Sequence, residues 1–158
     1  MHLLPMTDAH FAWLLGGPAP DGAPRLAEGG LAPEEIVDLL RGVASEVGPT
    51  VDGAAAWMMV VDGEGVGMIS IKERDGRGRW DIGYGVAPSR EGRGHTTAAV
   101  AELARIAFAT GATGLTAETL PDSGASPQVL RRNGFACIGQ FDHPEDGMVD
   151  QWVLEWVS

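Results

Sequence analysis

Apolar and polar positions alternate with the period of a strand in the middle of the chain, between segments with the period of a helix. Residues 55–61 and 66–72 are apolar or alternating runs, and the Asp-Gly-Glu-Gly sequence at 62–65 between them is typical of a hairpin turn. A second glycine-rich turn at 75–78 leads into a third run at 79–86. Because tight turns join antiparallel neighbours, these three runs predict an antiparallel meander.

The segment before the meander predicts one short strand and two helices. Residues 2–4 form a strand candidate, and Thr7 is a suitable N-cap for a helix over 8–15. A second helical pattern at 33–44 opens with Pro-Glu-Glu, which is typical of a first helical turn. The intervening stretch 16–30 is rich in glycine and proline and predicts a loop. We expect this loop and the second helix to form a mobile wall over a substrate site.

The C-terminal half predicts two helices and three strands. Apolar residues recur on one face of 95–110, and a short strand follows at 114–118. A strand–helix–strand unit of this length predicts a right-handed parallel crossover. A short helix over 126–132 has serine in its N-cap position and proline next to it. Residues 135–141 and 151–156 then predict a closing antiparallel pair.

This order of elements indicates an α+β fold. We expect a mixed, mostly antiparallel sheet of about seven strands with helices on both faces. The length of 158 residues fits one domain, since domains most often contain ~100–150 residues. We therefore expect a single domain over residues 1–158.

The segment RWDIGYGVAPSREGRGHTT at 79–97 carries the most informative local pattern. A strand-like run ends before Pro88, and a loop with Gly92 and Gly94 leads directly into a helix. Glycine allows positive φ angles and lets the backbone approach a ligand without a Cβ in the way. The first helical turn adds free N–H groups and about half a unit of positive charge. Together these features predict a phosphate-binding cradle.

Composition narrows the choice of partner. The net charge of −11 argues against nucleic acid and anionic membranes, because neutralising phosphates requires clustered lysine and arginine. Positively charged or amine-bearing partners fit an acidic chain better. The chain shows neither a signal-peptide pattern nor an apolar run of ~18 residues, so we expect a cytoplasmic protein.

Metal and thiol chemistry have little support in the sequence. The four histidines lack the spacing of metal ligands, so we expect no metal site. Cys137 is the only cysteine and lies in a strand-like segment, where we expect a buried, inert thiol. No cysteine is therefore placed to carry a covalent acyl intermediate.

Two motifs resemble those of the GNAT superfamily of acyl-CoA-dependent N-acyltransferases. The sequence GYGVAPSREGRGHTTAAV is similar to the acetyl-CoA motif of that superfamily. The sequence SGASPQVLRRNGFACIG is similar to the Asn-x-x-Ser-x-x-Val-Leu-x-x-x-Gly-Phe signature of the branch that contains the ribosomal-protein N-terminal acetyltransferases. The resemblance covers roughly residues 79–139. It implies a GNAT-like fold, acetyl-CoA as acyl donor, an amine-bearing acceptor, and direct attack in a ternary complex; a homodimer is left open.

The resemblance also implies roles for single residues. Val86 would offer backbone groups to the pantetheine arm, and a strand bulge there would aim an N–H at the thioester carbonyl. Ser126 would lie near the thioester or the pantetheine. The pyrophosphate would be held by the backbone N–H groups of the cradle, which are those of Gly92, Arg93, Gly94, His95, Thr96 and Thr97.

Four features depart from the family pattern. Glu91 stands where Arg or Gln is usual, which places a negative charge near the pyrophosphate, and Arg90 is the neighbour that could compensate. Thr96 replaces a small residue, and Ser123 replaces the asparagine of the signature. Many relatives use a tyrosine late in the chain as general acid, but Tyr84 is the only tyrosine here.

Transfer of an acyl group to an amine needs a base for the nitrogen and a proton for the leaving thiolate. Glu118, at the end of a strand beside the cradle, is the preferred candidate base, directly or through water, with Asp81 and Glu73 as alternatives. Ser126 is a candidate catalytic hydroxyl, although its pattern also fits a helix cap. Tyr84 is expected to pack against the site or to order it.

Two other functions fit parts of the sequence. GRGHTT opens a helix after a strand and Glu118 follows about 20 residues later, as in a dinucleotide-binding unit, but Thr97 stands where the third glycine belongs. A non-catalytic module that binds acyl-CoA as a sensor or interaction domain is the second alternative, which Glu91 and the missing tyrosine keep open. The acceptor also stays open among a protein N-terminus, a lysine, a polyamine and an aminoglycoside.

Overall fold

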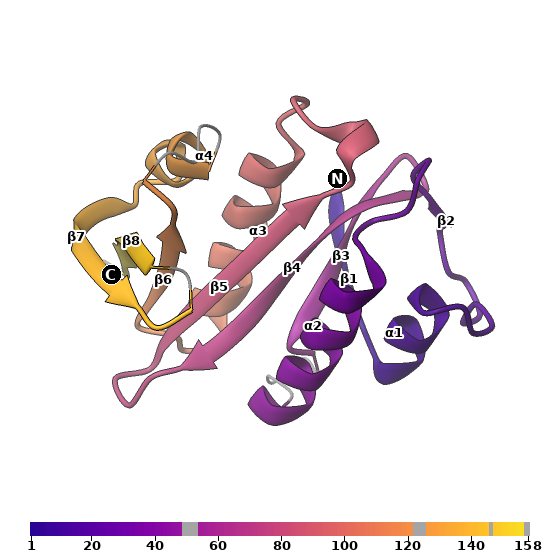
Figure 1. Ribbon diagram of the computed structural model, residues 1–158, viewed down its shortest axis with the longest axis horizontal. Helices are drawn as coiled ribbons and strands as arrows, with labels where there is room; N and C mark the ends of the chain where they lie inside the picture. Colours follow the sequence, from indigo (N-terminus) through magenta and orange to yellow (C-terminus); the bar gives the residue numbers. More distant parts are fainter. Residues whose placement is uncertain (49–53, 122–125, 146, 157–158) are drawn as a thin grey trace.

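A computed structural model describes residues 1–48, 54–121, 126–145 and 147–156 (Figure 1). An eight-stranded sheet forms the centre, with strand order β1-β3-β4-β5-β6-β8-β7 and with β2 paired to β4 off this path. Helices α1 and α2 lie on one face of the sheet and α3 and α4 on the other (Figure 1).

Helices and strands are interspersed along the chain. The N-terminal half contains β1 (His2–Pro5), α1 (Asp8–Leu14), β2 (Arg25–Leu26), α2 (Glu34–Val47), β3 (Ala56–Val61), β4 (Glu64–Arg74) and β5 (Arg79–Val86). The C-terminal half contains the short 3-10 turn η1 (Pro88–Arg90), α3 (His95–Ala109), β6 (Gly114–Thr119), α4 (Ser126–Arg132), β7 (Ala136–His143) and β8 (Gly147–Glu155).

The predicted fold class is confirmed. The sheet is mixed and mostly antiparallel, its main path has seven strands, and β5 and β6 are parallel across the α3 crossover. The additional strand β2 lies inside the predicted loop 16–30, where two residues pair with Glu64 and Gly65 of β4. This order differs from the repeated parallel βαβ units of a dinucleotide-binding fold.

Two predicted elements are shorter than the observed ones. Helix α2 continues to Val47, beyond the predicted end at 44. Strand β8 begins at Gly147, before the predicted start at 151, because it pairs with β7 as far as the turn. Residues 147–150, Gly-Met-Val-Asp, do not alternate between apolar and polar positions, so the sequence pattern did not indicate that β8 begins there.

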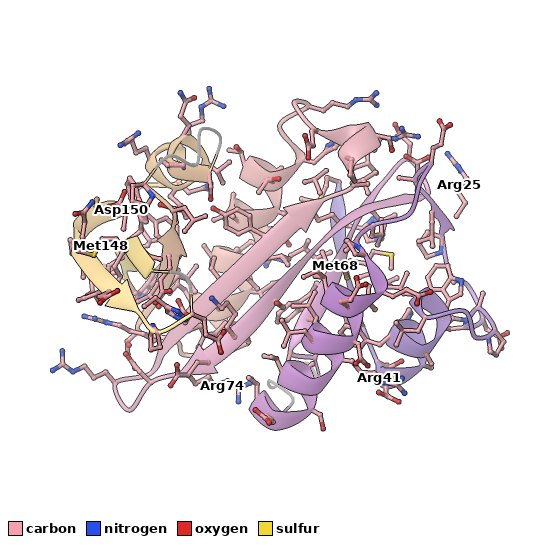
Figure 2. The ribbon with its side chains drawn as sticks, viewed as in Figure 1. Arg25, Arg41, Met68, Arg74, Met148 and Asp150 are labelled. Atoms are coloured by element: carbon pink, nitrogen blue, oxygen red, sulfur yellow. The ribbon has the colours of Figure 1, made fainter. Side chains whose placement is uncertain are left out.

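The alternation of side chains along each strand produces two cores. Trp57, Ile69 and Ile82 face α3 and α4 and pack against Leu103 of α3. The opposite face carries a second cluster around Met58 and Met68, which α1 and α2 cover. Figure 2 shows Met68, which is 6% exposed, on β4 beside α2. Each face of the sheet is therefore held by its own pair of helices.

Strands β5 and β6 separate, and this separation positions the site. Strand β5 pairs with β4 along its whole length, from Trp80 to Val86, but pairs with β6 only at residues 79–81. Beyond that point the two strands diverge, as Figure 1 shows. The Ala87 N–H donates to the Val66 carbonyl of β4 at 2.7 Å. Since backbone groups alternate in direction along an antiparallel strand, those of Val86 point the other way, into the gap.

Two local expectations are wrong. The pairing of β5 with β4 is regular from Ile82 to Val86, so the bulge expected at Val86 is not there; the irregularity lies between Ile71 and Glu73 of β4. The departure of β6, rather than a bulge, leaves the backbone of Val86 open. Cys137 is exposed rather than buried, because it lies on β7, at the edge of the sheet.

Candidate active site

A cavity of about 830 Å³ lies where β5 ends, between the glycine loop, the start of α3 and α4. Its lining includes the seven residues expected to contact the acyl-CoA and also Ser126, which together come from two separate motifs. These are Val86, Gly92, Arg93, Gly94, His95, Thr96, Thr97 and Ser126. The structure thus brings the two motifs together around one space.

The start of α3 has the geometry of an anion site. Gly94 is the N-cap residue and has a φ of 79°, and Gly92 in the same loop has a φ of 75°. A glycine N-cap has no side chain to bond the first helical N–H groups, and the first turn of α3 contains no acidic residue. His95, Thr96 and Thr97 line the cavity, and their N–H groups therefore have no capping side chain.

Position 94 favours glycine because of its backbone conformation, and not because neighbouring atoms leave no room for a side chain. A Cβ added there would meet no heavy atom within 4 Å. The positive φ would still cost an L-residue roughly 1–2 kcal/mol. An open loop of this kind can bring its amides close to a diphosphate, and the residues present therefore fit one.

Arg90 does not point its charge at the cradle. Its guanidinium makes two hydrogen bonds to the Glu64 carboxylate, at 2.6 and 3.1 Å, and so anchors the loop to the start of β4. This pairing with Arg90 lowers the pKa of Glu64. The cationic side chains that line the cavity besides Arg90 are Arg93 and Arg132, and Glu91 lines it as well.

Two hydroxyl groups meet beside the gap between β5 and β6. The Tyr84 hydroxyl and Ser126 Oγ lie 2.6 Å apart, and either can donate. Burial raises the pKa of Tyr84, while the hydrogen bond to Ser126 opposes that shift. Ser126 is the first residue of α4, and Ser123 lies outside the described residues. No local sequence pattern connects these two hydroxyls, because 42 positions separate them in the chain.

The Asn133 side chain links the end of α4 to the beginning of α3, in addition to the packing of Leu130 in the core that α3 covers. The Asn133 amide donates to the Thr97 carbonyl at 3.2 Å and to the Val129 carbonyl at 2.9 Å.

A second cavity, of about 390 Å³, opens on the other face of the sheet. It shares Tyr84 and Gly85 with the first cavity, so the two cavities are neighbours at this part of β5, beyond the residues that pair with β6. One side of it is lined by Leu31 and Ala32, which lie between the predicted loop 16–30 and α2, and by four apolar residues of α2. Strands β4, β5 and β6 line the other side.

Carboxylates gather in this second cavity. Glu118 is half-buried, and its Oε2 lies 4.0 Å from His143 Nε2. Asp81 accepts a hydrogen bond from Thr116 at 2.9 Å and lies 4.0 Å from the Lys72 ammonium. Burial raises the pKa of Asp81, against the opposing effects of Lys72 and Thr116. Glu73 lines the same cavity.

The strand register orders these carboxylates relative to the junction at Gly85. Asp81 pairs with Thr116, and the two strands are parallel, so Glu118 stands two positions closer to the junction than Asp81 does. His143 accepts a hydrogen bond at Nδ1 from the Glu145 N–H at 3.2 Å. A neutral His143 ring therefore carries its proton on Nε2, the atom nearer Glu118.

Sequence reasoning missed Gly67, which lies opposite the end of β5. A Cβ at Gly67 would lie 2.5 Å from the Gly85 carbonyl oxygen and 3.1 Å from Val86 Cα, so only glycine allows β4 and β5 this approach. The available signal was a glycine inside an apolar strand, which often marks a close backbone approach. His143 was missed because no local pattern connects it to Glu118.

The described residues provide two further observations. None of the helices within the described ranges is long and apolar enough to cross a membrane. In the same part of the chain, no group of three or more His, Cys, Asp or Glu side chains is arranged to hold a metal ion.

Comparisons with solved structures give the same fold. RimL, a ribosomal L7/L12 alpha-N-protein acetyltransferase in complex with coenzyme A, is 18% identical, with a TM-score of 0.67 over 97% of this chain and 92% of that one. The aminoglycoside acetyltransferase AAC(6')-Ib, also in complex with coenzyme A, is 18% identical, with a TM-score of 0.67 over 97% and 93% of the two chains. A GNAT-family acetyltransferase from Bacillus anthracis is 17% identical, with a TM-score of 0.62 over 80% and 76%.

Comparison at the level of sequence identifies the family. None of the curated proteins compared with the chain matches it significantly. The family model described as an acetyltransferase (GNAT) domain matches residues 3–136, which include the cradle, β6 and α4. By this match and by its fold, the chain belongs to the GNAT acetyltransferase family.

Proposed function

We propose that this protein is an acetyl-CoA-dependent N-acetyltransferase that transfers an acetyl group to a primary amine by direct attack in a ternary complex. The observation that carries the proposal is the junction of two cavities at Tyr84 and Gly85. One cavity contains an anion cradle, and the other offers carboxylates to an amine. Membership of the acetyltransferase family supports the same reaction.

The donor would occupy the larger cavity. Acetyl-CoA supplies the thioester, and its diphosphate is suited to the N–H groups of His95, Thr96 and Thr97. Arg93 and Arg132 would add positive charge along the same cavity. The pantetheine arm would run through the gap between β5 and β6, along the open backbone of Val86. The coenzyme A in the RimL and AAC(6')-Ib structures supports a donor of this class.

The acceptor would approach from the smaller cavity. Its nitrogen forms the new N–C bond with the carbonyl carbon, the C–S bond breaks, and the nitrogen releases one proton. Glu118 is the carboxylate closest along the strands to the junction, so we assign it the role of base, acting through water. An alkylamine that titrates near ~10.4 is mostly protonated at neutral pH, so it makes a greater demand on this base than an α-amino group near ~7.8.

The leaving thiolate must take up one proton. Tyr84 and Ser126 are the hydroxyl pair at the junction, and of the two only a phenol has a pKa in the range of a thiol. We therefore assign the proton to Tyr84, given directly or through Ser126. This assignment replaces the late tyrosine of many relatives with one from β5.

The test is a coenzyme A release assay with a panel of primary amines, combined with calorimetry of coenzyme A. Binding and turnover of at least one amine would support the proposal. Binding without turnover across the panel would favour a non-catalytic acyl-CoA module. Absence of coenzyme A binding would refute both functions.

A further inference from the structure

The smaller cavity has two chemically different sides. The α2 side is apolar, and two of its side chains are unusually exposed, Ile36 by 44% and Leu39 by 61%. The sheet side carries Glu73, Asp81 and Glu118. An acceptor that fills this space must therefore combine an apolar segment with positive charge.

Negative charge in the cavity exceeds what its own cations neutralise. Three carboxylates line it, whereas Lys72 is the one lysine or arginine among its described lining residues. His143 faces Glu118, and Thr116 donates to Asp81. The same three carboxylates also line a neighbouring polar cavity of about 190 Å³, where Asp75 accepts hydrogen bonds from its own turn and Arg79 pairs with Glu155. A ligand with more than one cationic group would balance this charge.

The strand register gives the spacing of these groups. Asp81 lies four positions before Gly85 on β5, or roughly 13 Å at ~3.3 Å per residue. Glu118 lies two positions beyond Thr116, the partner of Asp81, and is therefore nearer than Asp81 to the Gly85 end of the cavity. An amine that reacts at Gly85 would thus reach Asp81 and Glu73 with a second cation at the far end of a short aliphatic chain.

The cavity carries few neutral hydrogen-bonding side chains, so any neutral polar group of a ligand would have to share the carboxylates and Lys72. Among its described lining residues, only Ser70, Tyr84 and His143 carry neutral hydrogen-bonding side chains, and Ser70 is 5% exposed. The hydroxyls of a sugar or the amides of a peptide each need a partner when they are buried. Methylene groups need none, and Ile36 and Leu39 would cover them.

From these observations we propose that the acceptor is an aliphatic diamine or polyamine, with its reacting nitrogen at Gly85 and a second cationic nitrogen at Asp81 and Glu73. This inference rests on the proposed function and names its substrate class. The carboxylates select the second charge, and the apolar side of α2 selects the chain between the charges.

The test compares spermidine with a linear monoamine of the same chain length, a serine-initiated peptide and an aminoglycoside. Coenzyme A release is measured at low salt, because exposed charges are screened over ~10 Å at 0.1 M salt. We expect kcat/KM for spermidine to exceed that for the monoamine about 10- to 100-fold, the range of a charge-assisted hydrogen bond. Asp81→Asn should reduce this preference, mainly through KM for spermidine. Glu102→Gln, on the exposed surface of α3 that covers the other face, is the matched control and should leave the preference intact.

Equal kcat/KM for spermidine and the monoamine would overturn the inference, as would better turnover of the peptide or the aminoglycoside. In those cases turnover itself would leave the proposed function intact. If no amine is turned over, the proposed function fails, and calorimetry of spermidine with the coenzyme A complex decides the inference. Spermidine binding that Asp81→Asn weakens would support it, and absence of binding would overturn it.

Discussion

The cradle at the start of α3 can be tested by changing Gly94, the residue whose conformation creates it. Gly94 has a φ of 79° and open space around its Cα. Gly94→Ala should therefore lower the free energy of unfolding mainly through its strained backbone conformation, by roughly 1–2 kcal/mol. In a chain of this size that corresponds to a fall in Tm of about 2–8 °C. Gly94→Asp has a smaller conformational cost, because aspartate tolerates a positive φ better than alanine, and it adds a carboxylate beside the amides that would hold the diphosphate.

The expected loss of coenzyme A affinity follows from the bonds that the carboxylate displaces. One charge-assisted hydrogen bond is worth about 1.5–3 kcal/mol, so Gly94→Asp should weaken coenzyme A binding at least about 10-fold. Gly94→Ala should weaken it less, since it brings no charge.

Gly111 provides the matched control at the other end of the same helix. It also has a positive φ, 99°, and open space around its Cα, and it lies about 25 Å from Gly94 along α3. Gly111→Ala and Gly111→Asp should lower the Tm by comparable amounts and leave coenzyme A affinity unchanged. Calorimetry and thermal unfolding measure both quantities. If Gly94→Asp lost stability but bound coenzyme A as tightly as the wild type, the cradle would be assigned to the wrong residues.

Three further changes test other parts of the site. Tyr84→Phe keeps the ring and removes the hydroxyl, so kcat should fall by about 10²-fold or more while calorimetry shows unchanged coenzyme A binding; an unchanged kcat would exclude Tyr84 as the acid. Gly67→Ala places a Cβ 2.5 Å from the Gly85 carbonyl oxygen, so it should cost about 1–3 kcal/mol of unfolding free energy and weaken coenzyme A binding. Gly76→Ala, in an open turn, is its control, and equal effects of the two would contradict the role of the close approach. Burial raises the pKa of Asp81 in the folded state, so the folded protein binds a proton there more strongly than the unfolded chain does. The free energy of unfolding therefore falls as the pH rises from the unfolded pKa through the folded pKa. Asp81→Asn should therefore have a higher Tm than the wild type at neutral pH, and the difference should shrink below about pH 4, which unfolding curves across pH measure directly.

Most of the fold followed from local patterns. The meander, the crossover helix and the closing hairpin each have a sequence signal, because turn residues and hydrophobic periods act over a few positions. Strand β2 and the length of β8 lacked such a signal, since their pairing depends on neighbouring strands. The burial of Cys137 was misjudged for the same reason, because alternation does not show that a strand lies at the edge of the sheet.

The sequence by itself determined the glycine loop and helix start of the proposed cradle, because the φ angles of Gly92 and Gly94 and the free amides of a helix start are properties of adjacent residues. Tertiary structure alone decided what faces the cradle. Tyr84 meets Ser126, Arg90 meets Glu64, and Gly67 admits the backbone of Gly85 across distances in sequence that no local pattern spans. The gap between β5 and β6, beside which both cavities contact β5, arises because β6 stops pairing with β5 after residue 81. Hydrophobic periodicity specifies which face of a strand is buried, but only the packing of the whole sheet specifies where two strands part.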